Sequence, residues 1–188
     1  MTKQGVILCP GPSVVGFVPT VGKTIIGVNR VVRDYRLDWW VVGDPKTIEN
    51  GRQWIRSGQS PNVFLKPGVD GGALTESTIL SWKSEAIKKR YTTPDGGEMV
   101  NRSVLAAIVL AVNMGLEVVE MYGADMNGEA YYDGQPLTEL MDTTKTPDEC
   151  VSRLNDRWLR ERQYVAELID WADTHGCKVQ RNREEIMI

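Results

Sequence analysis

The chain has 188 residues, of which 25 are acidic and 22 basic; 41% are hydrophobic and 7% aromatic, and the formal net charge is −3. A chain of this length buries roughly 70% of its unfolded surface in one domain, so neither disulfides nor a structural metal are needed for a stable core. The negative net charge argues against a general nucleic-acid binder, which leaves nucleic acid a role only as an acceptor.

The apolar segments near the start and in the middle of the chain are too short to enter a membrane. Val6 to Leu8 is shorter than a signal-peptide core, and the longest run, Val104 to Val112, is about half the length that a bilayer requires. The three cysteines lie far apart without paired spacing. We therefore expect reduced, buried cysteines and a cytoplasmic protein with no membrane span.

Short, continuously apolar runs alternate with helical patterns along the chain. The runs predict strands over Gly5–Cys9, Thr24–Val28, Trp39–Val42, Val63–Leu65, Leu116–Tyr122 and Cys177–Gln180. Helices are expected over Pro45–Ser57, Leu74–Arg90, Ser103–Met114 and 147–175. Continuous rather than alternating runs favour a parallel sheet covered on both faces. The pattern predicts one α/β domain over residues 1–188, with a Rossmann-like, doubly wound, mostly parallel sheet.

The last helix has the clearest boundaries. Thr146 to Glu149 forms a capping box with proline at the first helical position, and Gly176 ends the helix. A stripe facing the sheet is predicted at spacings of three, four and seven residues, formed by Val151, Leu154, Trp158, Val165, Leu168 and Ala172. The preceding segment, 126–145, is polar, turn-rich and long for a connection, so we expect it to act as a lid.

Polar residues and glycines follow the ends of four expected strands. They are Gly11, Pro12 and Ser13 after the first, Asn29 after the second, Asp44 after the third, and Gly123 and Asp125 after the Leu116 strand. Such strand ends converge on one ligand-binding crevice in a doubly wound sheet. Ser103 opens the buried helix and adds a hydroxyl and backbone N–H groups suited to an anion. Common turn chemistry explains each residue equally well when it is taken alone.

Ordered motifs extend this pattern over most of the chain. They are Gly11-Pro12-Ser13, Gly27-Val28-Asn29, Asp44-Pro45 and the block 103–125, which joins a serine, an alanine-rich helix, Gly115 and a terminal Gly-x-Asp. With these motifs, from about residue 4 to residue 180, the chain resembles the bacterial lipooligosaccharide sialyltransferases (glycosyltransferase family 42). It is also similar to the related hydroxymethylpterin diphosphokinase-like and flagellin-glycosyltransferase-like domains.

The resemblance implies a nucleotide-sugar site without a metal or other cofactor. It places Gly11 and Ser13 near the phosphate, Asn29 and Asp125 near the nucleoside, and Ser103 near the sugar or phosphate, with Pro12 and Gly123 beside them. Tyrosines of the family's lid neutralise the leaving phosphate, a role that a phenol O–H suits. Tyr131 or Tyr132 lies where one is expected, and Asn127 stands at the position of a second.

One departure from the family concerns the general base. Residues 126–174 contain no histidine, so we expect Asp44, where the family has asparagine, to take the acceptor proton. The prediction is a glycosyltransferase-like enzyme that moves a sugar to a hydroxyl acceptor. The alternatives are a diphosphokinase-like phosphotransferase, in which Asp44 binds Mg²⁺, and a non-catalytic nucleotide-binding module.

Two further features of the sequence bear on partners. Arg153 and Arg157 belong to a solvated helix face or, being close to the lid, to a phosphate site. Four tryptophans, Trp39, Trp40, Trp54 and Trp171, would support a homo-oligomer wherever they are exposed.

Overall fold

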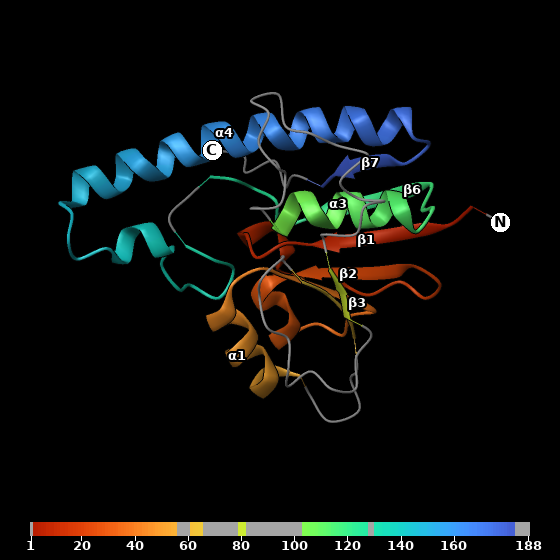
Figure 1. Cartoon of the computed structure of the whole chain (residues 1–188), viewed down its shortest axis with the longest axis horizontal. Coiled ribbons are helices and arrows are strands. Elements are labelled where there is room, and N and C mark those ends of the chain that lie inside the picture. The colour runs from red at the N-terminus through yellow and green to blue at the C-terminus, as the bar shows by residue number, and fades with distance from the viewer. Residues whose placement is uncertain (1, 56–60, 66–78, 82–102, 128–129, 183–188) are drawn as a thin grey trace.

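The computed structural model of the chain describes residues 2–55, 61–65, 79–81, 103–127 and 130–182 (Figure 1). Seven strands form one sheet in the order β5-β4-β3-β2-β1-β6-β7, and all neighbouring strands pair in parallel. Their bounds are β1 Gln4–Leu8, β2 Thr24–Val28, β3 Trp39–Val42, β4 Asn62–Leu65, β5 Ile79–Ser81, β6 Val118–Tyr122 and β7 Lys178–Arg181. The predicted Rossmann-like α/β sheet is thereby confirmed.

The direction in which the sheet grows reverses at β1. From β1 the chain adds β2, β3, β4 and β5 on one side, and it then returns to place β6 and β7 on the other. In open α/β sheets, the carboxyl edge at such a reversal is where a crevice forms, because the loops leave to opposite faces. The region beyond the ends of β1 and β6 is therefore the place to look for a ligand site.

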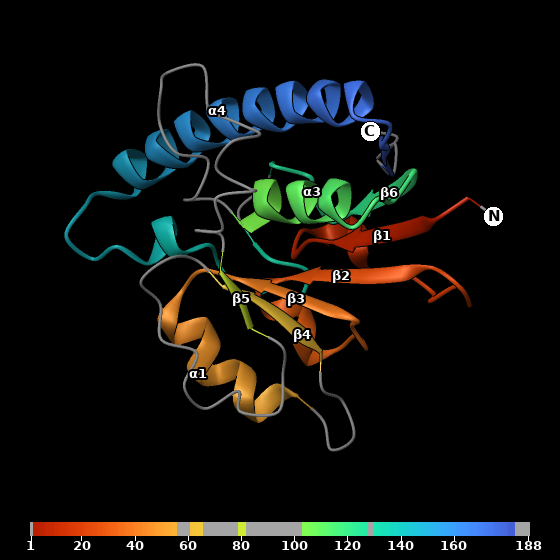
Figure 2. The same ribbon diagram turned by 45° about the vertical axis from the view of Figure 1, so that its right-hand side comes forward.

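Helices cover both faces of the sheet (Figures 1 and 2). The helices α3 (Ser103–Asn113) and α4 (Pro147–Thr174) lie together on one face, whereas α1 (Pro45–Trp54) and the short 3-10 helices η1 (Pro12–Val14) and η2 (Asn29–Arg33) lie on the other. Alternate residues of each strand supply the two cores: in β1, Ile7 faces α3 while Val6 and Leu8 face the opposite layer. This burial on both faces explains the continuously apolar strands.

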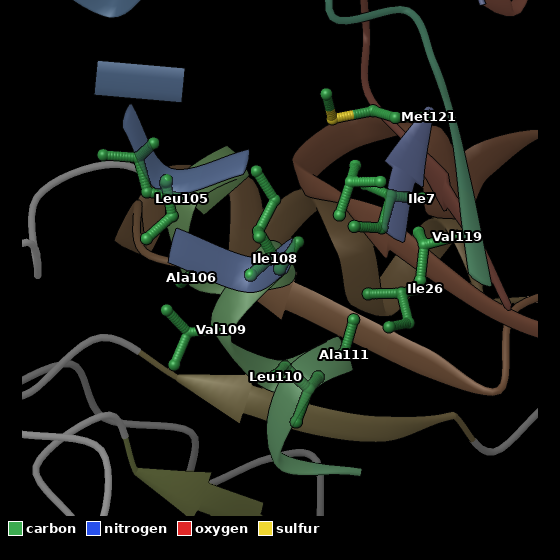
Figure 3. Packing of buried hydrophobic residues seen from close by; sticks show 14 of the residues in the cluster. Ile7, Ile26, Leu105, Ala106, Ile108, Val109, Leu110, Ala111, Val119 and Met121 are labelled. Atoms are coloured by element: carbon green, nitrogen blue, oxygen red, sulfur yellow. The ribbon is translucent and has the colours of Figure 1, made fainter. Parts of the chain in front are cut away.

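The helix α3 is apolar on nearly every side because it lies between the sheet and α4. Every residue from Leu105 to Val112 is buried, and Figure 3 shows its side chains against Ile7 and Ile26 of the sheet. Gly115 follows with a φ of +71°, a left-handed conformation that glycine adopts without strain. The predicted helix and its stop are confirmed.

The predicted helix over Leu74–Arg90 is wrong where the structure can be compared with it. Ile79–Ser81 forms β5, an edge strand paired in parallel with β4, and the rest of that prediction lies outside the described residues. Helical composition is a weak preference, and the unpaired edge of β4 gives this segment hydrogen-bond partners that override it. The helix α1 ends at Trp54, and residues 56 and 57 of its predicted span also lie outside the described part.

The capping box of α4 is present. The Thr146 hydroxyl accepts from the backbone N–H of Glu149, and the Glu149 carboxylate accepts from that of Thr146. Val151, predicted on the buried stripe, is instead 38% exposed, because the first turns of α4 extend past the sheet and pack on η4 (Thr138–Met141). Cys150 is buried in its place.

The tryptophans do not form the exposed surface considered for a homo-oligomer. Trp40 is fully buried, and Trp39, Trp54 and Trp171 are partly buried against the two cores. All three cysteines are free and buried, as expected. None of the helices in the described ranges combines the length and the apolar character needed to span a bilayer.

Candidate functional site

A cavity of about 260 Å³ lies at the carboxyl edge of the sheet, where the sheet changes direction. Its lining comes from the loops after β1, β2, β3 and β6, from the start of α3, from the segment that follows β6, and from α4. Most of the predicted site residues line it, namely Gly11, Pro12, Asn29, Asp44, Ser103, Gly123, Asp125, Asn127 and Tyr131. Ser13 and Tyr132 are absent from the lining among the described residues.

Hydrogen bonds donated by backbone N–H groups join the loops after β1 and β6 into the floor of the cavity. The Gly11 N–H donates to the Gly123 carbonyl at 2.8 Å, and the Gly123 N–H donates to Ser13 Oγ at 2.9 Å. The Ser13 N–H in turn donates to Asp125 Oδ2 at 2.9 Å. Ser13 therefore holds the two loops together rather than facing a ligand, and one Asp125 oxygen is committed to this contact.

The glycines of this floor are required by close packing. A Cβ on Gly123 would lie 1.9 Å from the Cys9 carbonyl oxygen, and the φ of Gly123 is +69°. A Cβ on Gly11 would lie 2.4 Å from Asp125 Oδ2. Both distances are far inside van der Waals contact, so a larger residue would separate the loops that form the site.

Asn29 links the end of β2 to the start of α3. Its backbone is left-handed, with a φ of +53°, and its carbonyl accepts from the Trp40 indole N–H at 2.7 Å. Its side-chain Oδ1 accepts from Ser103 Oγ at 3.2 Å. Nothing in the described part of the chain bonds to its Nδ2, so this amide N–H₂ group is available to a ligand in the cavity.

Asp44 has a structural role that sequence reasoning did not assign to it. It is the N-cap of α1, where Oδ1 accepts from the N–H groups of Lys46 at 2.8 Å and Thr47 at 3.4 Å. Its residue is exposed and lines the cavity. Since both cap bonds use Oδ1, Oδ2 stays available for a proton or a ligand hydroxyl.

The two neighbouring tyrosines differ in position. Tyr131 lines the cavity, with the Arg30 guanidinium carbon 3.9 Å from its ring centroid. Tyr132 packs against the core on the face of the sheet that α1 covers, and its hydroxyl donates to Asp34 Oδ2 at 2.5 Å. Burial, together with the Asp34 carboxylate, raises the Tyr132 pKa above its ordinary value. Of the pair that the sequence left open, only Tyr131 can touch a ligand there.

An ionic cluster of Arg30, Arg33, Asp34 and Asp133 attaches the first part of the predicted lid to η2. Asp133, whose side chain is 6% exposed, accepts from Arg30 Nη1 at 3.1 and 3.2 Å and from Arg33 Nη1 at 2.8 Å. Arg33 also pairs with Asp34 at 2.8 Å. These bonds hold the turn that carries Tyr131 against the body of the protein.

The α4 wall of the cavity contains residues that the site prediction missed. Arg157, Trp158 and Glu161 line it, whereas Arg153 lies outside and pairs with Asp142 at 2.9 Å. Of these three residues, the sequence suggests only Arg157, together with Arg153, for a phosphate site. A signal for Glu161 was present in the sequence, because it occupies the buried stripe of α4 between Leu154 and Val165.

Cys9 also lines the cavity, at the end of β1. Burial raises the pKa of its thiol well above the ordinary value, and the nearby Asp125 carboxylate raises it further. The thiol is therefore neutral at physiological pH and contributes a small apolar surface to the floor.

Comparison of the chain with protein-family models, curated proteins and solved structures finds no match. Within the described ranges, no three His, Cys, Asp or Glu side chains gather as a metal site. The described residues that line the cavity offer carboxylates and amides beside one arginine and one phenol. Carboxylates and amides form hydrogen bonds with hydroxyls and base edges, and arginine and phenol N–H and O–H groups bond oxyanions.

Proposed function

We propose that this chain binds a nucleotide-activated sugar in the cavity and transfers the sugar to a hydroxyl acceptor. One observation supports the proposal most directly. Polar residues from four separate strand ends surround one cavity at the position where doubly wound sheets bind nucleotides. Carboxylates and amides in such a position suit the hydroxyls of ribose and of a sugar. This arrangement supports a nucleoside-linked sugar better than a bare polyphosphate, which carboxylates would repel.

The contacts proposed for the donor follow from the available atoms. Asn29 Nδ2 and the second oxygen of Asp125 bond the nucleoside. Ser103, with the first backbone N–H groups of α3, lies beside the phosphate, because the start of an α-helix favours negative charge. The Tyr131 hydroxyl donates to a phosphate oxygen as negative charge develops on it.

The proposed transfer is a single displacement at the anomeric carbon of the sugar. The acceptor oxygen attacks this carbon, and its proton passes to Asp44 Oδ2. The bond between the anomeric carbon and the phosphate oxygen breaks, and its electron pair leaves with the phosphate. Asp44 suits the step because its Oδ1 is held by the α1 N–H groups, which fixes the orientation of Oδ2.

Calorimetric titration with nucleotides and nucleotide sugars, followed by product analysis with hydroxyl acceptors, tests the proposal. Asp44→Asn keeps a good helix cap, because asparagine caps as well as aspartate, and it should abolish turnover while leaving donor affinity within about twofold. Tyr131→Phe should slow turnover, whereas the matched variant Tyr132→Phe, outside the cavity, should not. Absence of binding by every nucleotide and nucleotide sugar at millimolar concentration would refute the proposal.

Two other outcomes would favour the alternatives. ATP consumption that EDTA abolishes, and that Asp44→Asn removes, would support a magnesium-dependent phosphotransferase in place of sugar transfer. Nucleotide binding without turnover, unaffected by Asp44→Asn or Tyr131→Phe, would support a non-catalytic binding module.

A further inference from the structure

The α4 wall of the cavity carries an ion pair that the proposed transfer does not use. Arg157 Nε donates to Glu161 Oε1 at 2.8 Å, and the guanidinium carbon lies 5.0 Å from the Trp158 ring centroid. All three residues line the cavity. Glu161 is 6% exposed, and the Arg157 side chain is 32% exposed. The pair therefore lies between the protein interior and the space available to a ligand.

Stabilisation of the helix does not explain this pair. Arginine before glutamate at i and i+4 is the weaker order, because the opposite order also suits the helix dipole. Burying a carboxylate costs more desolvation than an exposed helical pair returns. An apolar residue at position 161 would continue the buried stripe of α4 through Leu154, Val165 and Leu168. In this pair, Glu161 holds the Arg157 guanidinium in a fixed orientation at the cavity wall.

The charges around the cavity indicate which kind of ligand group would contact the Arg157 guanidinium. Among the described residues that line it, Arg157 carries the only positive side chain, while Asp44 and Asp125 supply carboxylates on the sheet edge. Glu161 on the α4 wall is paired with Arg157, so a ligand oxyanion would be repelled by the sheet edge and would find charged N–H donors only in the Arg157 fork, among the described lining residues. Arginine has five N–H donors in a planar fork, so bonds to groups of the protein are compatible with a further bond to an oxyanion.

We propose that Arg157, oriented by Glu161 and Trp158, binds a phosphate group of the ligand at the α4 wall of the cavity. The assignment of this phosphate to a nucleotide rests on the proposed function. The anion site itself rests on the ion pair and its place in the cavity. The proposed site lies between α4 and the start of α3, and the nucleoside then lies over the ends of β2 and β6, beside Asn29 and Asp125.

The test compares nucleoside 5′-monophosphates with the matching nucleosides by calorimetric titration. The double variant Arg157→Gln/Glu161→Gln removes both charges, so that no unpaired carboxylate stays buried. It should lower monophosphate affinity about tenfold or more and change nucleoside affinity less than about twofold, because a charge-assisted bidentate contact is lost only with the phosphate. The matched control, Arg160→Gln, alters an exposed arginine of α4 outside the cavity lining and should change neither affinity. Equal losses for both ligands, or no loss, would overturn the proposal.

A double-mutant cycle of binding affinities tests separately whether Glu161 orients Arg157. Across the cycle of single and double variants, the effects of Arg157→Gln and Glu161→Gln should be non-additive for monophosphates and additive for nucleosides. A purely structural role would make both ligands behave alike. If the double variant does not fold, Arg157→Lys keeps a charge opposite Glu161 but loses the fork; weaker monophosphate binding supports the site and unchanged binding overturns it.

Inorganic phosphate separates this proposal from the proposed function. If the wild-type protein binds no nucleoside or nucleotide, sugar transfer is refuted, and titration with phosphate then decides the anion site alone. Saturable phosphate binding that the double variant loses would support the site. Absence of phosphate binding, or binding that both proteins share, would overturn it.

Discussion

Replacement of Asp133 by asparagine should loosen the turn that carries Tyr131. The Asp133 carboxylate is 6% exposed and accepts three hydrogen bonds from Arg30 and Arg33 at 2.8 to 3.2 Å. Asparagine keeps the volume and one acceptor oxygen but removes the charge. Hydrogen bonds to charged groups contribute ~1.5–3 kcal/mol each, but the arginines are 25% and 36% exposed and stay partly hydrated, so the expected loss is about 2–3 kcal/mol.

Urea unfolding followed by tryptophan fluorescence measures this loss, and the melting temperature should fall by about 4–12 °C for a chain of this size. Asp142→Asn is the matched control, because the Asp142 pair with Arg153 has side chains 29% and 54% exposed and solvent screens it. Its effect should be clearly smaller. Equal destabilisation by the two variants would show that the buried ionic cluster contributes no more than a surface pair, and would refute the reasoning.

Three further predictions concern the floor of the cavity and the sheet. Gly123→Ala should unfold the protein or lower its melting temperature far more than Gly134→Ala, since both have positive φ but only the first Cβ meets backbone, the Cys9 carbonyl; equal melting temperatures would contradict this. The hydrogen bond from Lys23 lowers the Glu120 pKa below 4.5, so its contribution to stability is present above that pH and is lost as the pH falls through the folded pKa. The unfolding free energies of wild type and Glu120→Gln should therefore differ at pH 7, and this difference should shrink as the pH is lowered through the acidic range; a constant difference would contradict the assignment. Iodoacetamide at pH 8 should modify Cys9 only in denaturant, as peptide mass spectrometry would show, because burial blocks access and raises the thiol pKa; rapid modification of the native protein would exclude this environment.

Local patterns were enough to predict most elements and the place of the site. The continuous apolar runs of β1 to β4 indicate burial on two faces, and this signal can be read from each strand by itself. The capping box before α4 and the glycine after α3 are equally local. Since parallel strands end at a common edge, the residues that follow them were expected to converge, and most of them line one cavity.

Predictions from local patterns failed or stayed incomplete where contacts with another element of the fold determined the conformation or role of a residue. The segment Ile79–Ser81 reads as helix by composition, but it forms β5 because the edge of β4 supplies hydrogen-bond partners. The helical spacing places the charged Glu161 on the buried stripe of α4, but only the packing of α4 along the cavity shows that this residue lines it. In both cases the deciding contact comes from another element of the fold.

What the sequence by itself determined was the class of fold and the edge of the sheet at which polar residues gather, because apolar periodicity and helix caps act over a few neighbouring residues. The tertiary structure alone decided that Tyr131 lines the cavity while Tyr132 bonds Asp34. It likewise decided that Asp133 meets two arginines of η2. The partners in these pairs are about a hundred residues apart in the chain, and only the packing of the segment after β6 against η2 brings them within bonding distance.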